Sequence, residues 1–226
     1  MAFKWNGIHA TEIGLMADIT GLPFRPLPKI ATEQLPAMDG FLDFSMFNNN
    51  NRVHYNPREW VFQCWLELKR NMNINIVMNE IAKIFMVHSG YLEVDECPGV
   101  RWQAIVANRF DIANVAINAK SFNIYFQSQP FAEGLTPITQ TTPITTNPTT
   151  INLTNPGTWH TRPNAYLTGT ANNARIGGLP IPNQGELTNA LVWCPELAPG
   201  ANSLSISGFT GSIRFEFTPL YIWSLP

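Results

Sequence analysis

The sequence predicts a mainly β fold with one α-helix, arranged in two domains. Short segments of alternating apolar and polar residues, separated by turn residues, recur along the 226-residue chain. Such alternation is typical of strands with one buried face. The apolar spacing changes to a helical period only between Asn71 and Gly90. A segment composed almost entirely of Thr, Pro, Ile, Asn and Gln, from Thr136 to Thr150, divides the strand pattern in two.

Three short strands are expected in the first 50 residues, each bounded by Pro, Gly or Asn. They cover residues 12–19, 30–35 and 42–46. Asp39-Gly40 is interpreted as a tight turn before the third strand, because Asp-Gly readily supplies the positive φ that such turns require. A loop or hairpin tip is expected at the run Asn48, Asn49, Asn50 and Asn51.

The clearest strand is expected over residues 59–69. Its apolar face carries Trp60, Phe62, Cys64, Leu66 and Leu68. The opposite face carries Gln63, Trp65, Glu67 and Lys69. A large aromatic side chain such as Trp65 on an otherwise polar face indicates that a second sheet, the helix or a neighbouring subunit covers this face too.

One amphipathic helix is expected between residues 71 and 90. Its apolar stripe consists of Ile74, Val77, Ile81, Ile84, Phe85 and His88. One of the asparagines at 71, 73 and 75 is expected to cap the N-terminus, and Gly90 to follow the C-terminus. His88 would then lie at the C-terminal end, where a cationic side chain interacts favourably with the helix dipole.

The remaining strands are expected on both sides of the Thr/Pro-rich segment. They cover residues 91–96, 100–107, 112–116 and 122–126, and then 149–153, 165–170, 191–193, 203–207 and 213–217. We therefore expect an N-terminal domain over 1–131, a Thr/Pro-rich linker with a first strand over 132–150, and a C-terminal β-sandwich over 151–226. A sugar-bearing stalk is the alternative interpretation of the Thr/Pro-rich segment.

Composition restricts the classes of function. The formal net charge is -2 and only 13% of residues are charged, so no basic stripe can neutralise phosphates and specific nucleic-acid binding is not expected. No apolar stretch approaches the ~20 residues of a membrane span, and the first residues lack the apolar core of a signal peptide. Cys64, Cys97 and Cys194 are widely spaced and are expected to be reduced thiols in or near a core.

No pattern of catalytic or metal-binding residues is found. The serines and cysteines lack the local signatures of activated nucleophiles, and the four histidines are not at metal-ligand spacing. The only local acidic cluster is Glu93, Asp95 and Glu96. Paired carboxylates can cleave glycosidic bonds, but these acids precede Cys97-Pro98-Gly99 and are better explained as a solvated turn. We expect no enzyme activity, no metal and no cofactor.

The aromatic residues of the C-terminal half leave two interpretations open. Trp159, Trp193, Tyr221 and Trp223 could fill the core of a small β-sandwich. Trp159 and Trp193 could instead provide apolar platforms for sugar rings. The core interpretation is favoured, because most tryptophans of a small domain are needed to fill it.

The order of several short motifs resembles the distal tail proteins (Dit) of long-tailed bacteriophages. In the first half these are Phe3-Lys4-Trp5-Asn6-Gly7, Ile13-Gly14-Leu15, Arg25-Pro26, Asp39-Gly40-Phe41, Pro57-Arg58, Ser89-Gly90-Tyr91 and Cys97-Pro98-Gly99. In the second half, Asn155-Pro156-Gly157-Thr158 and Pro199-Gly200-Ala201-Asn202 are similar to the galectin-like domain of many such proteins. The chain departs from the family in having Ala37-Met38 where Gly-Arg is usual, and in its short C-terminal half.

The resemblance implies an N-terminal β-sandwich or split-barrel-like domain with one α-helix, and a small C-terminal galectin-like β-sandwich. It implies a structural component of the virion, assembled in the bacterial host cytoplasm: a homo-hexameric ring that joins the tail tube protein to the tail-associated hub protein. Receptor-binding or baseplate proteins are further partners, and DNA passes without specific binding. A carbohydrate-binding adsorption module is the alternative function.

The same resemblance suggests roles for the residues singled out above. Subunit contacts are expected at Asp39, Gly40, Asn48, Asn49, Asn50, Asn51 and Trp65. A mildly acidic lining of the channel is expected from Glu93, Asp95 and Glu96.

Overall fold

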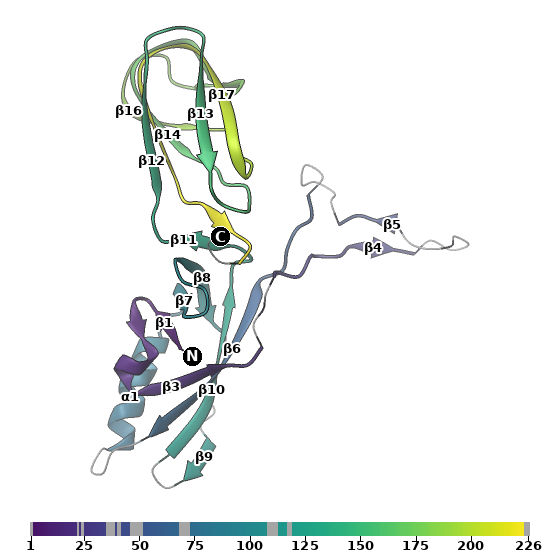
Figure 1. Ribbon diagram of the computed structural model, residues 1–226, viewed down its shortest axis with the longest axis vertical. Coiled ribbons are helices and arrows are strands. Elements are labelled where there is room, and N and C mark those ends of the chain that lie inside the picture. Colours follow the sequence, from purple (N-terminus) through teal and green to yellow (C-terminus); the bar gives the residue numbers. More distant parts are fainter. Residues whose placement is uncertain are drawn as a thin grey trace. The chain divides into compact units, whose positions relative to one another are not determined.

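The chain forms two compact units, residues Met1–Ala132 and Glu133–Pro226. The computed structural model describes residues 2–21, 23, 25–34, 39, 42–45, 52–67, 73–107, 113–116 and 119–223. Strands dominate both units, and α1 is the one α-helix of these residues (Figure 1). The prediction of a mainly β fold with a single α-helix is confirmed.

Unit 1 is built on an antiparallel sheet. The strands are β1 (Phe3–Trp5), β2 (Ile8–His9), β3 (Leu15–Ile19), β6 (Arg58–Glu67), β7 (Ser89–Val94), β8 (Val100–Val106), β9 (Ala113–Ala116) and β10 (Ala119–Ser128). Their order is β2-β1-β7-β8-β10-β6-β3, with β9 paired to β10. The first strand predicted over 12–19 begins only at Leu15, because residues Ala10–Ile13 form a 3₁₀ turn that ends at Gly14 in a left-handed conformation.

Strand β6 lies inside this sheet, between β10 and β3. Trp60, Phe62, Cys64 and Leu66 are buried, whereas Gln63 is exposed and Trp65 is half-buried. The predicted alternation is therefore confirmed for these residues; Leu68 and Lys69 lie outside the described part. All ten residues of β6 pair with β10, so the central pair of strands forms a continuous ladder.

Helix α1 runs over Ile74–Phe85 and covers the apolar face of the sheet. It begins as predicted with an asparagine cap, since the Asn73 side chain accepts a hydrogen bond of 2.9 Å from the Asn75 N–H. Ile81 and Phe85 are buried, and the Phe85 ring lies 6.2 Å from that of Phe3. These contacts fix the helix on the sheet.

The predicted C-terminal end of the helix is wrong. The helix stops at Phe85, and Gly90 belongs to β7, where it is in register with Ala104 of β8. His88 is exposed beyond the last helical turn, so it does not cap the helix. Ser89 and Gly90 form backbone pairs with β8 and are therefore part of a strand. The helical spacing of apolar residues in the sequence does not show this pairing.

The core of unit 1 is rich in aromatic rings. Phe3 lies 4.5 Å from Phe62 and 5.4 Å from Phe126 between ring centroids. Trp60 and Trp102 form a second pair at 4.8 Å. All five side chains are buried, and such tilted and edge-on pairs stabilise a core beyond the burial of their area.

Two short strands of unit 1 form a sheet of their own, separate from the main sheet. They are β4 (Thr32–Glu33) and β5 (Leu42–Asp43), paired antiparallel (Figure 1). We call residues 27–34 and 42–45 the ribbon. Both strands are shorter than the sequence predicts, and residues 35 and 46, at the ends of the predicted strands, lie outside the described part, as does Gly40 of the predicted turn.

Unit 2 is organised by two long strands. Its strands are β12 (Ile138–Ile144), β13 (Thr149–Asn155), β14 (Asn164–Ile176), β15 (Leu179–Pro180), β16 (Gly185–Trp193), β17 (Gly200–Phe217) and the short β18 (Leu220–Tyr221). The short strand β11 (Ala132–Gly134) begins at the last residue of unit 1 and continues into unit 2. Strand β17 pairs with β13 through its first half and with β12 through its second half. Strand β14 pairs first with β16 and then with β15.

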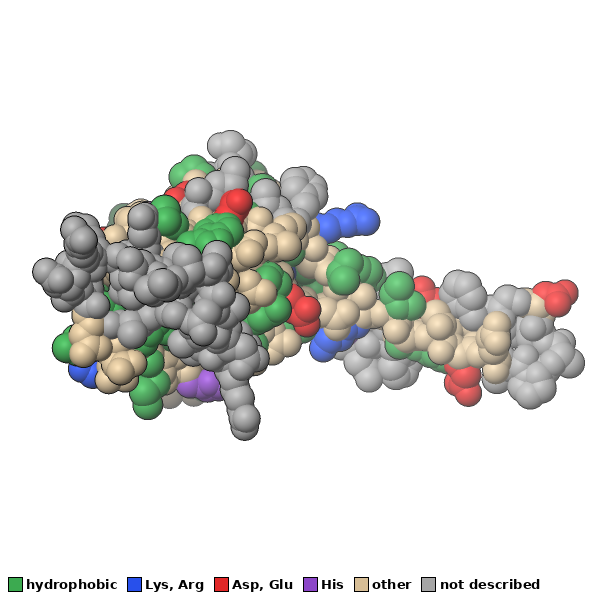
Figure 2. Space-filling model, turned by 90° about the horizontal axis from the view of Figure 1, so that it is seen from below, with side chains coloured by type: hydrophobic (Ala, Val, Ile, Leu, Met, Phe, Trp, Pro, Cys, Tyr) green, Lys and Arg blue, Asp and Glu red, His purple; other side chains and the backbone are tan. Residues whose placement is uncertain are grey.

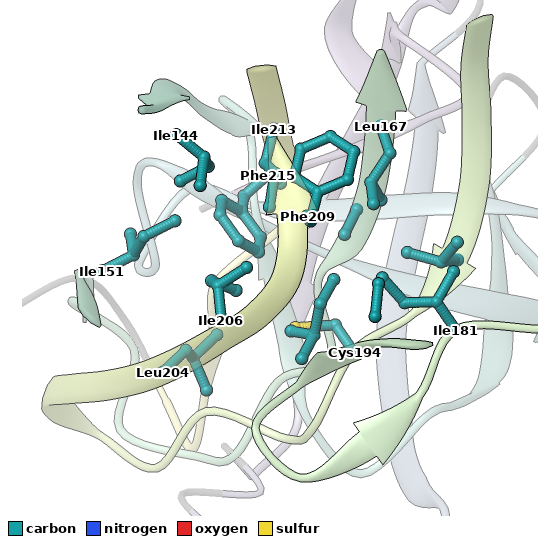
Figure 3. Close-up of a cluster of buried hydrophobic side chains, with 14 of the residues drawn as sticks. Ile144, Ile151, Leu167, Ile181, Cys194, Leu204, Ile206, Phe209, Ile213 and Phe215 are labelled. Atoms are coloured by element: carbon teal, nitrogen blue, oxygen red, sulfur yellow. The ribbon is translucent and has the colours of Figure 1, made fainter. Parts of the chain in front are cut away.

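The two halves of the long strands enclose one apolar core. Figure 3 shows its side chains pointing toward one another, among them Ile144, Leu167, Ile206 and Phe215. Because the core receives residues from β12, β13, β14 and β17 alike, the unit buries a continuous apolar cluster without a disulfide.

The Thr/Pro-rich segment is mostly strand. The part predicted as a linker contains all of β12, and β13 begins at Thr149. Pro143 interrupts the strand signal in the sequence, yet its side chain is exposed and β12 pairs only with β17 among the described residues. An edge strand tolerates proline because one of its sides needs no N–H donors.

The two strands predicted over 203–207 and 213–217 are joined into the single strand β17. The bend lies at Gly208, with φ +67°, and Gly211, with φ +145°. A Cβ at Gly211 would overlap the Thr168 carbonyl oxygen, and Gly211 is in register with Gly169 of β14. Strands β14 and β17 therefore approach each other closely at a pair of glycines.

Replacing Gly211 with alanine is expected to destabilise unit 2 by about 2 kcal/mol, through both the strained φ and the backbone overlap. Chemical denaturation of the full chain measures this change. The matched control is Gly178→Ala, at φ +83° with no atom within 4 Å of the added Cβ, which carries only the backbone strain of about 1 kcal/mol. Equal effects of the two substitutions would contradict the close approach of β14 and β17.

Candidate assembly surfaces and a candidate binding site

A buried arginine anchors the chain that leads into the ribbon. Arg58, at the start of β6, is 2% exposed. Its Nε donates a hydrogen bond of 2.7 Å to the Pro130 carbonyl, and its Nη1 donates one of 2.8 Å to the Pro23 carbonyl. Burial lowers the pKa of the guanidinium to about 10, so Arg58 stays protonated at neutral pH. It thus ties β6 to the segments around residues 23 and 130.

The base of the ribbon is held by backbone pairing. The Lys29 N–H donates to the His54 carbonyl at 2.7 Å, and the Asn56 N–H donates to the Leu27 carbonyl at 2.8 Å. The Tyr55 ring, which lies between these two pairs, contacts the Phe131 ring at 5.5 Å. The ribbon therefore starts from a fixed position on unit 1.

Apolar side chains of the ribbon are exposed. Leu27 is 67% and Ile30 is 73% exposed, and Leu42 and Phe44 are exposed as well. A two-stranded ribbon is marginally stable by itself in water, and clustered exposed apolar side chains mark interaction sites. The ribbon is the first candidate assembly surface. Of the predicted contact residues next to it, Asp39 is exposed, while Gly40, Asn48, Asn49, Asn50 and Asn51 lie outside the described residues.

The second candidate surface is the face of the main sheet opposite α1. Trp65 lies on this face between Met16 of β3 and Ser121 of β10, and Met16 and Tyr125 are exposed. Among the side chains that are not grey in Figure 2, Lys, Arg, Asp and Glu are few and scattered between hydrophobic and neutral ones. We call the face around Trp65 the outer sheet face. Trp65 is half-buried within its own chain, so part of the ring is available to a partner.

The acidic residues Glu93, Asp95 and Glu96 lie in and just after β7. Glu93 forms an ion pair of 3.7 Å with Lys4 of β1, and Asp95 Oδ1 lies 3.4 Å from His9 Nε2. These contacts tie Glu93 and Asp95 to β1 and β2, and the Lys4 ammonium offsets part of their charge. Both carboxylate oxygens of Glu96 are buried, so Glu96 does not belong to a solvated turn as expected. Among the described residues, no three His, Cys, Asp or Glu side chains gather in a way that would hold a metal ion.

The three cysteines are free and buried, so the prediction of reduced core thiols is confirmed. Burial raises the pKa of Cys64 and of Cys194 to about 12. Burial, followed by the neighbouring Glu96 carboxylate, raises that of Cys97 to about 11. Since the thiolate is the nucleophile, none of these thiols is activated at neutral pH.

We expect the folded chain to react with no thiol reagent equivalents at pH 8, because the thiolate fractions are on the order of 0.001 or less. Denaturant should expose three equivalents. A colorimetric thiol titration with and without denaturant measures this difference. Rapid reaction of one thiol in the folded chain would contradict its burial.

The two tryptophans considered as sugar contacts have different surroundings. Trp159 is half-buried, and its backbone N–H donates to the Leu220 carbonyl at 3.0 Å while its carbonyl accepts from Asn155 Nδ2 at 2.9 Å. Trp193, at the end of β16, is 74% exposed. The favoured interpretation of Trp193 as a core residue is therefore wrong: residue alternation in β16 turns its ring outward, between buried Val192 and Cys194.

A shallow pocket of about 360 Å³ lies beside Trp193. It is lined by Arg162, Pro163, Asn164, Leu191, Val192, Trp193 and Cys194. The Arg162 guanidinium lies 5.3 Å from the centre of the Trp193 ring, and its Nη2 is 3.4 Å from Glu196 Oε1. We call this the Trp193 pocket. No sequence motif distinguishes it, although an aromatic at an outward position of a strand is a usable signal once the strand register is known.

None of the helices among the described residues has the length and apolar character to span a membrane.

Comparisons with known proteins identify the fold. No protein-family model matches the sequence, and no curated protein matches it. Among solved structures, the chain is similar to the crystal structure of the SPP1 Dit protein (gp 19.1), described as a paradigm of the hub adsorption apparatus in phages that infect Gram-positive bacteria. The TM-score is 0.67 at 11% sequence identity, over 97% of this chain and 98% of that chain. The protein therefore has the fold of a Dit protein along its whole length.

Proposed function

We propose that this chain, which has a Dit fold, is a non-enzymatic structural component of a phage virion: a distal tail protein. In this role it forms a hexameric ring that connects the tail tube to the tail-tip hub and to the host-adsorption apparatus. The observation that carries the proposal is the match to SPP1 Dit across both units, which covers 97% of this chain and 98% of the other. Both units match the other protein, and they follow in the same order along the chain. This is stronger support than a match of one β-sandwich alone, because that fold occurs in proteins of many functions.

The ribbon supports a ring of identical subunits. Its exposed Leu27 and Ile30 need a partner surface, and each copy offers the same ribbon and the same outer sheet face. A contact between two different surfaces of identical chains closes into a ring when the rotation per subunit allows it. The half-buried Trp65 on the outer sheet face is our candidate acceptor for a neighbouring chain.

The sheet of unit 1 supplies further contacts for such a ring. Strand β3 pairs only with β6 among the described residues, so one edge of the sheet keeps backbone groups available for another chain. A closed ring removes such edges from solvent. We place Glu93 and Asp95 on the channel side, where a weakly acidic lining would let DNA pass without binding. Glu96, which the sequence also suggested for this lining, is left out because both of its carboxylate oxygens are buried.

The proposed partners follow from the position at the tail tip. They are the tail tube protein on one side and the tail-associated hub protein on the other, with receptor-binding or baseplate proteins attached to a galectin-like unit 2. Assembly takes place in the cytoplasm of the bacterial host, and the mature location is the virion.

Immunogold electron microscopy of the virions tests this position. Antibodies against unit 2 are expected to label the end of the tail distal to the head. Labelling on the head, or infectious particles that lack the protein altogether, would overturn the proposal.

A further inference from the structure

We propose that unit 2 carries a binding site for neutral hexose polysaccharides, centred on the Trp193 pocket. The proposal goes beyond the role in the tail-tip ring, which does not require unit 2 to bind a sugar. It rests on the exposure of Trp193, on the neighbouring pocket, and on the neutralised charges around them.

The Trp193 ring is displayed by a rigid strand. Trp193 is in register with Asn164 of β14, and its neighbours Val192 and Cys194 are buried in the core of unit 2. The backbone at this point is therefore fixed, while 74% of the tryptophan surface faces solvent. Leu191, two residues earlier on the same face, is also exposed. A pair of large apolar side chains held outward on one strand forms a preorganised contact surface.

The pocket beside this surface has the size of a small-ligand site. Its volume of about 360 Å³ falls within the range of roughly 300–1,000 Å³ found for such sites. Trp193 and Leu191 supply its apolar wall, and Asn164 and Arg162 its polar groups. Few polar groups beside an apolar wall suffice to fix the orientation of a bound ring.

Hydrogen-bonding groups continue from the pocket across the sheet. Asn164 lies between Trp193 of β16 and Glu216 of β17 in register. Since neighbouring strands are about 4.8 Å apart, this row extends over about 10 Å. Amide, carboxylate and guanidinium side chains provide both donors and acceptors, as hydroxyl groups require.

A second row lies beside the first. Tyr166 of β14 is in register with Leu191 on one side and with Arg214 on the other. The Arg214 guanidinium lies 4.6 Å from the centre of the Tyr166 ring. The face thus offers aromatic surface and hydrogen-bonding groups over more than one sugar ring, which suits a polymer.

The charges on this face favour an uncharged ligand. Arg162 interacts with the Glu196 carboxylate, and Arg214 Nη2 lies 3.4 Å from Asn189 Oδ1. Glu196 and Glu216 balance the charges of the two arginines, so these four side chains have no net charge. The face therefore does not attract phosphates or nucleic acid electrostatically. A pyranose ring combines an apolar C–H face with neutral hydroxyl groups. The negative face of an indole ring attracts such C–H bonds.

Affinity electrophoresis of the full chain in gels containing galactan, mannan or dextran tests the proposal. We expect at least one of these neutral polymers to retard the chain. Trp193→Ala should weaken the retardation about tenfold or more, and Trp193→Phe should retain part of it, because a smaller aromatic face remains. Since Trp193 is exposed, both variants are expected to fold.

The matched control is Leu179→Ala, which removes another exposed apolar side chain of unit 2, in β15. It should leave the retardation unchanged. The proposal is overturned if none of the neutral polymers retards the chain, if Trp193→Ala is retarded like the wild type, or if only the anionic polymer polygalacturonate causes retardation.

Discussion

Replacing Arg58 with methionine is expected to destabilise unit 1 by about 3–5 kcal/mol. The substitution keeps most of the side-chain volume but removes the donors that serve the Pro130 and Pro23 carbonyls at 2.7 and 2.8 Å. Hydrogen bonds from a charged donor contribute about 1.5–3 kcal/mol each, and an orphaned buried acceptor carries a full desolvation penalty. The lower desolvation of methionine offsets only part of this loss. Chemical denaturation of the full chain measures the change.

Two further variants give this experiment its controls. Arg162→Met removes an arginine that is half exposed and ion-paired with Glu196 on unit 2, and should change stability by less than about 1 kcal/mol. Arg58→Lys should give an intermediate loss, because one ammonium group cannot reproduce the geometry of the guanidinium. Similar small effects at positions 58 and 162 would contradict an anchoring role for Arg58.

Placing aspartate at both Ile30 and Phe44 of the ribbon is expected to prevent assembly of the proposed hexamer and to leave the protein monomeric. A fully buried Ile or Phe contributes about 1.5–3 kcal/mol to an interface, and an unpaired carboxylate in that position opposes association further. In a ring the loss recurs at every subunit contact. Light scattering coupled to size-exclusion chromatography would then report a mass near 25.3 kDa.

The control for the ribbon variant is Leu179→Asp, which introduces a carboxylate at an exposed apolar position of unit 2. It should leave the assembled mass unchanged. If the ribbon variant assembles like the wild type, the exposed apolar residues of the ribbon do not form the subunit contact.

The sequence predicts those features of the fold that depend on local periodicity. The alternation in β6 places Trp60, Phe62 and Cys64 in the core, and an asparagine cap marks the start of α1 at Asn73. Both patterns arise from the geometry of single elements. They are therefore readable without knowledge of the partners.

Features that depend on pairing between distant segments are not predictable in this way. The continuous strand β17 looks like two strands because Gly208 and Gly211 interrupt the alternation, and only its pairing with β14 joins them. Helix α1 ends at Phe85, and the chain then enters β7, where Gly90 pairs with Ala104 of β8. The sequence does not show this pairing. Pro143 argues against a strand in the sequence, so β12 is not predicted. The structure accommodates this proline because β12 lies at the edge of its sheet.

The candidate sites follow the same division. A buried arginine such as Arg58 cannot be distinguished by sequence from a solvated one, since its carbonyl partners lie 35 and 72 residues away. Trp193 and Trp159 look alike in the sequence, and the strand register of β16 decides which ring faces outward. Long-range contacts, more than residue types, thus determine the surfaces on which the proposed functions rest.

Native mass spectrometry of the purified full chain tests the central claim most directly. The proposed ring predicts a dominant species of about 152 kDa, six times the 25.3 kDa of one chain. A species of 25.3 kDa that persists at every protein concentration examined would contradict the assignment of this chain as a ring-forming tail protein.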